Sequence, residues 1–294
     1  MSMSIWVIFG ALAIGTAIGI LTGIFGVGGG FLVTPLLNVV LGVPIPVAVG
    51  TGLMQILGVS SSGLYRRRKQ RGIAIKLVTV LSGGSYVGVR LGAKTLNWLG
   101  TLGSLTLGGQ AVAAVDFYVL CIYFVVLLAI GSYLWYDTSK SAEEEETHRV
   151  GLFAKIKIPP YTNFRTLDEP SLSLPVISYF GLVLGYMTGL LGIGGGVIMV
   201  PALIYLIGLR THYAAATSLA LIWVSSFIGT ITHASLGNTR IGLLIPLLLG
   251  GTIGVQIGMN IGNKMGGHEL RRKFCYVVLV AVGIVAIKIV GILI

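Results

Sequence analysis

The sequence predicts an all-α polytopic membrane protein made of two inverted-topology repeats, each a Gly-broken helical hairpin followed by three transmembrane helices. Three observations lead there. The 294 residues are 55% hydrophobic and 10% charged, whereas about 25% of residues are charged in an ordinary soluble domain. Apolar runs recur that reach the roughly 20 residues needed to cross a bilayer. A glycine-rich segment occurs twice. The apolar runs are continuous rather than alternating, which argues against a β-barrel.

The apolar runs define the predicted membrane segments. They cover residues 5–25, 30–42, 46–65, 73–97 and 116–136, and then 173–191, 196–208, 212–233, 240–262 and 274–294. The chain therefore divides into a first membrane repeat (1–136), a central polar stretch (137–172) and a second membrane repeat (173–294). The central stretch carries a run of glutamates (143–146) and the prolines Pro159, Pro160 and Pro170. A segment of this composition is expected to be a solvated linker.

The repeat is visible residue by residue. Residues 19–35 read GILTGIFGVGGGFLVTP, and residues 185–201 read GYMTGLLGIGGGVIMVP, an offset of 166. Every glycine of the first copy has a glycine in the second, and Thr22 and Pro35 match Thr188 and Pro201. The match continues without a gap to Gly100 and Gly266, so the unit that is duplicated spans several helices.

Loop charges indicate that the two repeats have opposite orientations. Residues 66–71 read RRRKQR, while the matching loop around 232–240 has one arginine. The next pair of loops reverses the pattern, because 98–115 has no Lys or Arg and 263–273 has four. Basic loops stay in the cytoplasm. Loops 66–71 and 263–273 and the central linker are therefore predicted to be cytoplasmic, and the partners of these loops to lie outside.

Opposite orientation requires residues 5–42 to start and end on the same face, as a hairpin that turns at the glycine cluster. The second arm, 30–42, would be about 20 Å long as a helix, which is less than the hydrocarbon thickness. Two arrangements stay open: a re-entrant half-helix, or a short arm completed by the extended residues 43–46.

The two glycine runs, 26–30 and 192–196, are predicted to line a substrate site. Irregular backbone at membrane depth is tolerated only where it lines a cavity or is buried in protein, and inverted-repeat transporters bind substrate where the repeats meet. A helix that starts just after each run directs its N–H groups and its positive dipole end at the site, which favours an anion. Close helix packing is the alternative for glycines. We favour packing for Gly84, Gly88, Gly92, Gly250, Gly254 and Gly258.

Small polar side chains near the same depth complete the predicted site. Hydroxyl groups can donate to an oxyanion, or can bond back to a carbonyl of their own helix. Arg90 could attract the anion, or instead pair with a carbonyl or extend toward the interface. The predicted substrate-binding residues are Thr22, Gly28, Gly29, Gly30, Thr51, Gln55, Arg90, Thr188, Gly194, Gly195, Gly196, Thr217 and Ser218.

Other functional classes are disfavoured. The net charge of +11 resides in short loops between apolar segments, which indicates orientation in the membrane rather than nucleic-acid binding. No catalytic or metal-ligand constellation is present in the sequence, so neither an enzyme nor a cofactor is expected. Cys121 and Cys275 fit small buried hydrophobic residues. His212 and His233 could relay protons but fit structural roles better, and Asp116 stands at a helix end.

The doubled motif resembles the signature of the TauE/SafE (sulfite exporter-like) family of membrane permeases. The Ala-Thr-Ser at 216–218 is similar to the pattern of that family after the second copy, whereas the first copy has Gly-Thr-Gly at 50–52. The resemblance implies transport of small sulfur-containing anions such as sulfite, thiosulfate or sulfonates, often outward across a prokaryotic cytoplasmic membrane. The difference at 50–52 suggests that the two half-sites contribute unequally.

These observations predict a secondary transporter that works by alternating access around the paired glycine breaks. A passive anion channel with the same site is the alternative. The expected partners are a small anionic substrate, the lipid bilayer and a coupling ion, either a proton or sodium. The oligomeric state stays open.

Overall fold

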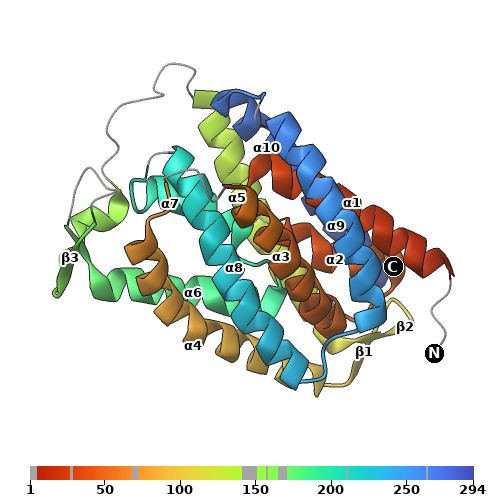
Figure 1. Ribbon diagram of the computed structural model, residues 1–294. Coiled ribbons are helices and arrows are strands. Elements are labelled where there is room, and N and C mark those ends of the chain that lie inside the picture. Colours follow the sequence, from red (N-terminus) through yellow and green to blue (C-terminus); the bar gives the residue numbers. More distant parts are fainter. Residues whose placement is uncertain are drawn as a thin grey trace.

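A computed structural model describes residues 5–26, 29–67, 72–140, 151–156, 158–164, 171–209, 211–262 and 264–294. Within these ranges the chain forms ten α-helices gathered in one bundle (Figure 1). They are α1 (Ile5–Phe25), α2 (Gly30–Leu41), α3 (Ile45–Arg67), α4 (Ile75–Gly100), α5 (Ala114–Lys140), α6 (Leu174–Leu191), α7 (Gly196–Tyr205), α8 (Thr211–Ser235), α9 (Ile241–Gly262) and α10 (Gly267–Leu293). Each coincides with one predicted segment, so the all-α prediction is confirmed.

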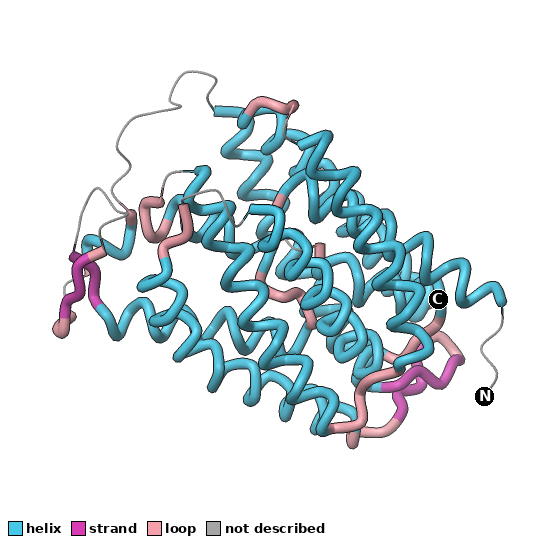
Figure 2. Tube along the Cα trace, in the orientation of Figure 1, coloured by secondary structure: helices cyan, strands magenta, loops and turns pink. Residues whose placement is uncertain are grey.

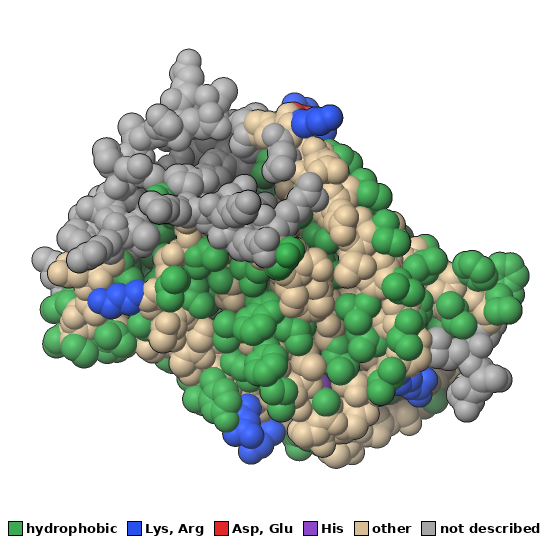
Figure 3. Space-filling model, in the orientation of Figure 1, with side chains coloured by type: hydrophobic (Ala, Val, Ile, Leu, Met, Phe, Trp, Pro, Cys, Tyr) green, Lys and Arg blue, Asp and Glu red, His purple; other side chains and the backbone are tan. Residues whose placement is uncertain are grey.

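Seven of the described helices are long and apolar enough to cross a membrane: α1, α3, α5, α6, α8, α9 and α10. Helix α4 has 26 residues but is more polar, since it carries Lys76, Arg90 and Lys94. Helix α2 is a shorter apolar helix of 12 residues. In the view of Figure 3, hydrophobic side chains are spread over the described surface, and the Lys and Arg side chains lie toward its edges. The surface is that of a multi-pass membrane protein.

Two small hairpins lie at opposite ends of the bundle (Figures 1 and 2). Strands β1 (Ser104–Leu107) and β2 (Gln110–Ala113) pair antiparallel in the stretch between α4 and α5 that was predicted as a loop. Strands β3 (Tyr161–Asn163) and β4 (Ser171–Ser173) pair antiparallel within and just after the central polar stretch.

The central stretch is not wholly a solvated linker. The 3-10 helix η1 (Leu152–Lys155) lies beside the end of α7, where the Phe153 N–H donates to the Leu206 carbonyl oxygen at 2.9 Å. The Phe153 ring contacts that of Phe180, and both Phe164 and Leu172 are buried. These apolar residues, set among polar ones, fold part of the stretch onto the second half. The glutamate run 143–146 lies outside the described residues.

The first helix of each half packs against the fourth helix of the other half. On α1, Gly15, Gly19 and Gly23 lie in turn against the backbone of Leu247, Gly251 and Val255 of α9. On α6, Gly181, Gly185 and Gly189 lie in turn against the backbone of Leu81, Ser85 and Val89 of α4. Residue numbers rise together along both helices of each pair, so the two helices of each pair are parallel. The two sets of contacts are related by the 166-residue offset of the sequence repeat.

Glycines on α4 and α9 likewise lie against the backbone of the facing helix. Those of α4 lie against the α6 backbone, and those of α9 lie against the α1 backbone. An added Cβ at Gly84, Gly88, Gly92, Gly250, Gly254 or Gly258 would overlap a carbonyl oxygen of the facing helix. The packing interpretation of these six glycines is therefore confirmed.

Helices α3 and α8 occupy equivalent places in the two halves and lie side by side, as Figure 1 shows. Gly63 of α3 is close to Leu219 of α8, and Gly229 of α8 is close to Leu53 of α3, so these contacts are reciprocal under the repeat offset. Along this contact, residue numbers rise on one helix while they fall on the other, so the two helices are antiparallel. The Trp223 indole N–H donates to the Ser61 hydroxyl across this pair at 2.8 Å.

The role of the glycine contacts can be tested on α4 alone. Gly88→Ala places a Cβ against the Leu182 carbonyl oxygen, whereas Gly83→Ala meets nothing within 4 Å. We expect Gly88→Ala to destabilise the protein by about 1–3 kcal/mol, the usual cost of overpacking. The matched control, Gly83→Ala, should be neutral or stabilising by up to about 1 kcal/mol, because alanine favours helix. Thermal unfolding of the purified variants in detergent measures both, and equal effects would contradict the packing role.

Candidate functional site

Each glycine run interrupts a helix through residues in the left-handed region. After α1, Gly26 has φ +68° and Gly29 has φ +58°. After α6, φ is +72°, +64° and +76° at Gly192, Gly194 and Gly195. Only glycine adopts such angles at little cost, so a glycine break separates α1 from α2 and α6 from α7. Gly28 lies outside the described residues.

The two breaks are built alike. The Gly26 N–H donates to the Thr22 carbonyl oxygen at 2.8 Å, and the Gly192 N–H donates to the Thr188 carbonyl oxygen at 2.8 Å. A short helix then begins directly after a left-handed glycine in each half, α2 after Gly29 and α7 after Gly195. The repeat therefore extends to the hydrogen bonds that end the entering helices.

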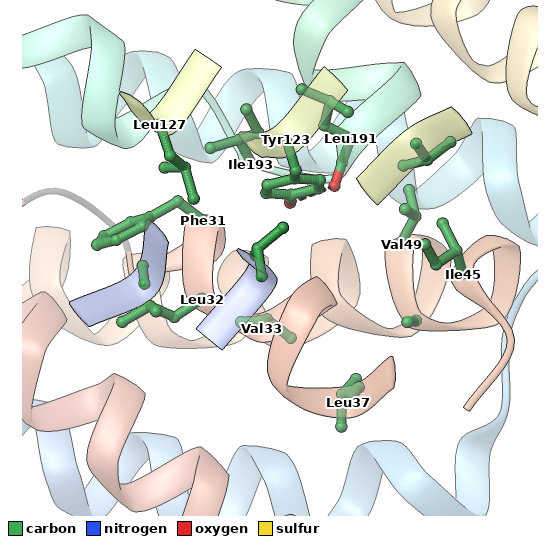
Figure 4. Close-up of a cluster of buried hydrophobic side chains, with 14 of the residues drawn as sticks. Phe31, Leu32, Val33, Leu37, Ile45, Val49, Tyr123, Leu127, Leu191 and Ile193 are labelled. Carbon is green, nitrogen blue, oxygen red and sulfur yellow. Dashed lines mark hydrogen bonds between the residues drawn. The ribbon is translucent and has the colours of Figure 1, made fainter. Parts of the chain in front are cut away.

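The two breaks contact one another in the interior. An added Cβ on Gly30 would overlap the carbonyl oxygen of Ile193, in the middle of the other break. Ile56 of α3 touches both, because its side chain lies against Gly30 and 3.3 Å from the Cβ position of Gly194. Figure 4 shows Phe31 and Ile193 within the buried hydrophobic cluster around this junction, and the Tyr123 hydroxyl donating to the Leu191 carbonyl oxygen at 2.6 Å.

The starts of α2 and α7 are suited to an anion. Neither helix has a side-chain hydrogen bond at its N-cap glycine. Most N–H groups of a first helical turn have no partner within the helix, and they add to the positive end of the helix dipole. In α2 the Leu32 N–H donates to the Gly29 carbonyl oxygen at 3.1 Å. Small ligands with negative charge bind at such helix starts through backbone N–H groups.

Four predicted hydroxyl groups have partners within the protein. Thr22 and Thr188 donate to the carbonyl oxygens of Ile18 and Leu184, at 2.8 and 2.9 Å. These are the back-bonds that the sequence left as an alternative.

The other two form reciprocal links between the halves. The Thr51 hydroxyl oxygen accepts the Arg240 N–H at 3.1 Å, and the Thr217 hydroxyl oxygen accepts the Ala74 N–H at 3.1 Å. Arg240 precedes α9 and Ala74 precedes α4, so each threonine holds the start of a helix of the opposite half. We name these two bonds the crossed threonine links.

Gln55 and two side chains beside the breaks, Thr34 and Ser226, have buried polar atoms without a hydrogen-bond partner. The Thr34 Oγ1 lies 2.9 Å from the Cβ position of Gly192. Gln55 is 0% exposed and neither of its amide atoms is paired; its Nε2 lies beside Gly251, where α9 meets α1. The Ser226 hydroxyl is unpaired and lies 3.4 Å from the Cβ position of Gly194. Its neighbour Ser225 donates to the Gly194 carbonyl oxygen at 3.4 Å. Buried unpaired polar groups are rare and often mark a place for a ligand or water.

Sequence reasoning selected Gln55 but not Ser225 or Ser226. The available signal was the repeat itself, since Ser226 matches Ser60. Ser218, eight residues before Ser226 on α8, is also fully buried. The half-sites are unequal, because the residue equivalent to Gln55 in the second half is Leu221.

Arg90 does not join this cluster. It lies on the exposed side of α4, where its guanidinium donates to the Tyr86 hydroxyl at 3.0 Å and stands 5.2 Å from the centre of that ring. A cation held by an aromatic side chain on the surface of the bundle is a local pairing, so we leave Arg90 out of the proposed site.

His233 has a structural environment. It is 0% exposed, its Nε2 is 2.9 Å from the Gly189 carbonyl oxygen, and its Nδ1 is 3.3 Å from the Asn238 amide nitrogen. This fixes the end of α8 beside the second glycine break. The side chain of His212 lies outside the described residues. Among the described residues no group of three or more His, Cys, Asp or Glu side chains could hold a metal ion.

Comparison with known proteins agrees with this architecture. The family model described as sulfite exporter TauE/SafE matches residues 11–286. The chain is 28% identical to the probable membrane transporter protein YjnA of Bacillus subtilis, over 92% of this chain and 96% of that protein. It is 26% identical to YunE of Bacillus subtilis, over 90% of both chains, and 25% identical to the probable membrane transporter protein MJ0441 of Methanocaldococcus jannaschii, over 86% of this chain and 87% of that one. No solved structure matches the chain significantly. The chain belongs to the sulfite exporter TauE/SafE family and is a multi-pass membrane transporter.

Proposed function

We propose that this transporter exports a small sulfur-containing oxyanion, such as sulfite, thiosulfate or a sulfonate, across the cytoplasmic membrane of a prokaryote. The observation that carries the proposal is the contact between the two glycine breaks at the starts of α2 and α7. The description of the family as sulfite exporters supplies the substrate class.

The proposed site recognises the anion through backbone groups and neutral side chains. Helix N-termini and amide or hydroxyl donors bind an anion without a fixed countercharge, so the anion is released more readily than from a buried arginine. The proposed site residues are Gly29, Gly30, Gly194, Gly195, Gly196, Gln55, Ser218 and Ser226. Thr22, Thr51, Thr188 and Thr217 shape the site through the bonds described above.

We propose that the repeats have inverted orientations in the membrane. The antiparallel contact of α3 with α8 and the parallel contact of α1 with α9 support this arrangement, as do the loop charges. The central stretch and the loops 66–71 and 263–273 would then be cytoplasmic.

Alternating access in this arrangement would move mixed helix pairs rather than whole repeats. The pairs α1–α9 and α4–α6 are joined at backbone distance through their glycines and would each move as one body. The antiparallel pair α3–α8 lies between them and carries Gln55 and Ser226, so a shift of either outer pair would open the site to one face.

The orientation can be tested with single introduced cysteines in a variant whose Cys121 and Cys275 are replaced by alanine. Thr106, in the exposed part of β1, and Lys264, just after α9, stand in loops that are equivalent in the two repeats. Inverted repeats predict that Thr106→Cys reacts with a membrane-impermeant maleimide in intact cells, while Lys264→Cys reacts only after permeabilisation. Labelling of both from the same face would refute the inverted orientation.

The substrate class is tested by anion flux in proteoliposomes that contain the purified full-length protein. Sulfite, thiosulfate and sulfoacetate should show saturable flux that depends on a proton or sodium gradient, with sulfate as the comparison anion. Gly29→Leu and Gly195→Leu should each reduce it at least about tenfold, because a side chain in the left-handed region strains and fills the break. Passive conductance that ignores both gradients would indicate a channel, and absence of any anion movement would contradict both.

Substitution of Gln55 gives a sharper test, because it should raise the stability of the protein and lower anion flux. Gln55→Leu installs the residue of the second half and removes an unpaired buried amide, so the protein should become more stable by about 1–3 kcal/mol. Anion flux should fall at least about tenfold, since a ligand partner is lost. The control, Gln256→Leu on the exposed side of α9, should leave flux unchanged. Loss of both stability and flux in Gln55→Leu would instead indicate a structural role for Gln55.

A further inference from the structure

A second polar cluster lies at the opposite end of α2 from the glycine break. Asn38, near the C-terminal end of α2, is 5% exposed and donates through Nδ2 to the Val43 carbonyl oxygen at 3.0 Å. The same nitrogen stands 3.4 Å from Oδ2 of Asp116, at the start of α5. The Asn38 Oδ1 is buried and has no partner. The cluster therefore holds a carboxylate and a carbonyl oxygen that share one amide donor, and the oxygen of that amide is unpaired.

The charges and dipoles around this cluster have both signs, because Asp116 stands in the first turn of α5, at the positive end of that helix dipole. Helix α2 ends at Gly42, with φ +63°, and the negative end of its dipole points at the cluster. Asp116 is half-buried, and its other oxygen, Oδ1, accepts the Ile45 N–H at 3.0 Å. The charge of Lys288, on α10, also acts on Asp116.

The equivalent bend of the second half is made without these polar groups. Gly208 has φ +87°, and the Leu209 N–H donates to the Leu203 carbonyl oxygen at 2.9 Å, as the Val43 N–H does to Leu37 at 3.0 Å. The position of Asn38 is there occupied by Ile204, which is buried. Closing the short helix therefore does not require an amide, and the cluster is confined to the first half.

We propose that Asn38, Val43 and Asp116 form a binding site for a monovalent cation, with sodium as the ion. Rotation of the Asn38 amide would exchange Nδ2 for Oδ1 and bring three oxygens together. The Asn38 nitrogen now lies 3.0 and 3.4 Å from the other two oxygens. Oxygen ligands about 2.4 Å from a hard cation are separated by about 3.4 Å in octahedral geometry. One carboxylate with neutral oxygens at a half-helix C-terminus suits a single positive charge.

The site would link a cation to the anion site through α2. Its ligands come from the end of α2, the segment after it and α5, whereas the start of α2 forms half of the junction of glycine breaks. A bound ion would fix one end of a helix about 18 Å long, and thereby the position of its other end. Only this link to anion transport rests on the proposed function. The cation would then be the coupling ion, bound toward the outer face of the membrane.

Thermal unfolding of the full-length protein in detergent tests the site without any anion. Chloride salts of sodium, potassium and choline are compared at one ionic strength. Sodium should raise the unfolding midpoint by about 3–5 °C when it is present at tenfold its dissociation constant. The rise should vanish in Asp116→Asn, whose amide oxygen can still accept the Ile45 N–H, and in Asn38→Ile, the residue of the second half.

The matched controls separate a site from general charge effects. Glu269→Gln removes an exposed carboxylate whose partner is Lys273, and should keep the full sodium response. Lys288→Met should lower the sodium concentration needed for half of the response, because a nearby positive charge is lost. Equilibrium binding of radioactive sodium ions gives the same answer for any variant of low stability.

Several results would overturn the proposal. A wild-type midpoint that is equal in sodium and choline, an undiminished sodium response in Asp116→Asn, or an equal response to potassium would each do so. Since no anion takes part, failure here leaves the anion flux result standing, and failure of the anion flux leaves this one standing.

Discussion

Glycine-to-backbone contact between helices of opposite halves sets the geometry of this transporter. Within the bilayer no hydrophobic force draws apolar helices together, so association depends on close approach. Stripes of glycine on α1, α4, α6 and α9 permit that approach, and the facing carbonyl oxygens occupy the space where side chains would otherwise stand. Each half is consequently completed by helices of the other.

The position of the glycine breaks follows from those contacts. Helices α1 and α6 are held along their length and end just before Gly26 and Gly192, so the breaks emerge at fixed places in the interior. The crossed threonine links add a second constraint, because each ties the start of a helix to the opposite half. The structure thus combines long helix pairs in backbone contact with two short helices, each of which starts at a glycine break.

Much of this arrangement could be predicted from the sequence. The apolar runs located all ten described helices, and the repeat offset anticipated equivalent contacts in both halves. Partners across the halves could not be predicted, because periodicity gives the face of a helix but not its neighbour. Thr51 and Thr217 were therefore interpreted as ligand groups, whereas their partners are backbone N–H groups far away in sequence. Arg90 was considered for the site because it lies within a predicted membrane segment. Its pairing with Tyr86 depends on the side of α4 that it occupies.

The pairing of α1 with α9 also constrains the order of assembly. During synthesis α1 emerges first, yet the helix that covers its glycine stripe follows more than 200 residues later. Until then the stripe faces lipid or a temporary neighbour, while α4 meets its own partner, α6, much sooner. The second pair can therefore form while the chain is still at the ribosome, whereas the first pair closes the fold near the end of translation. A ribosome that stalls before α9 would leave an inserted but open bundle, exposed to membrane proteases.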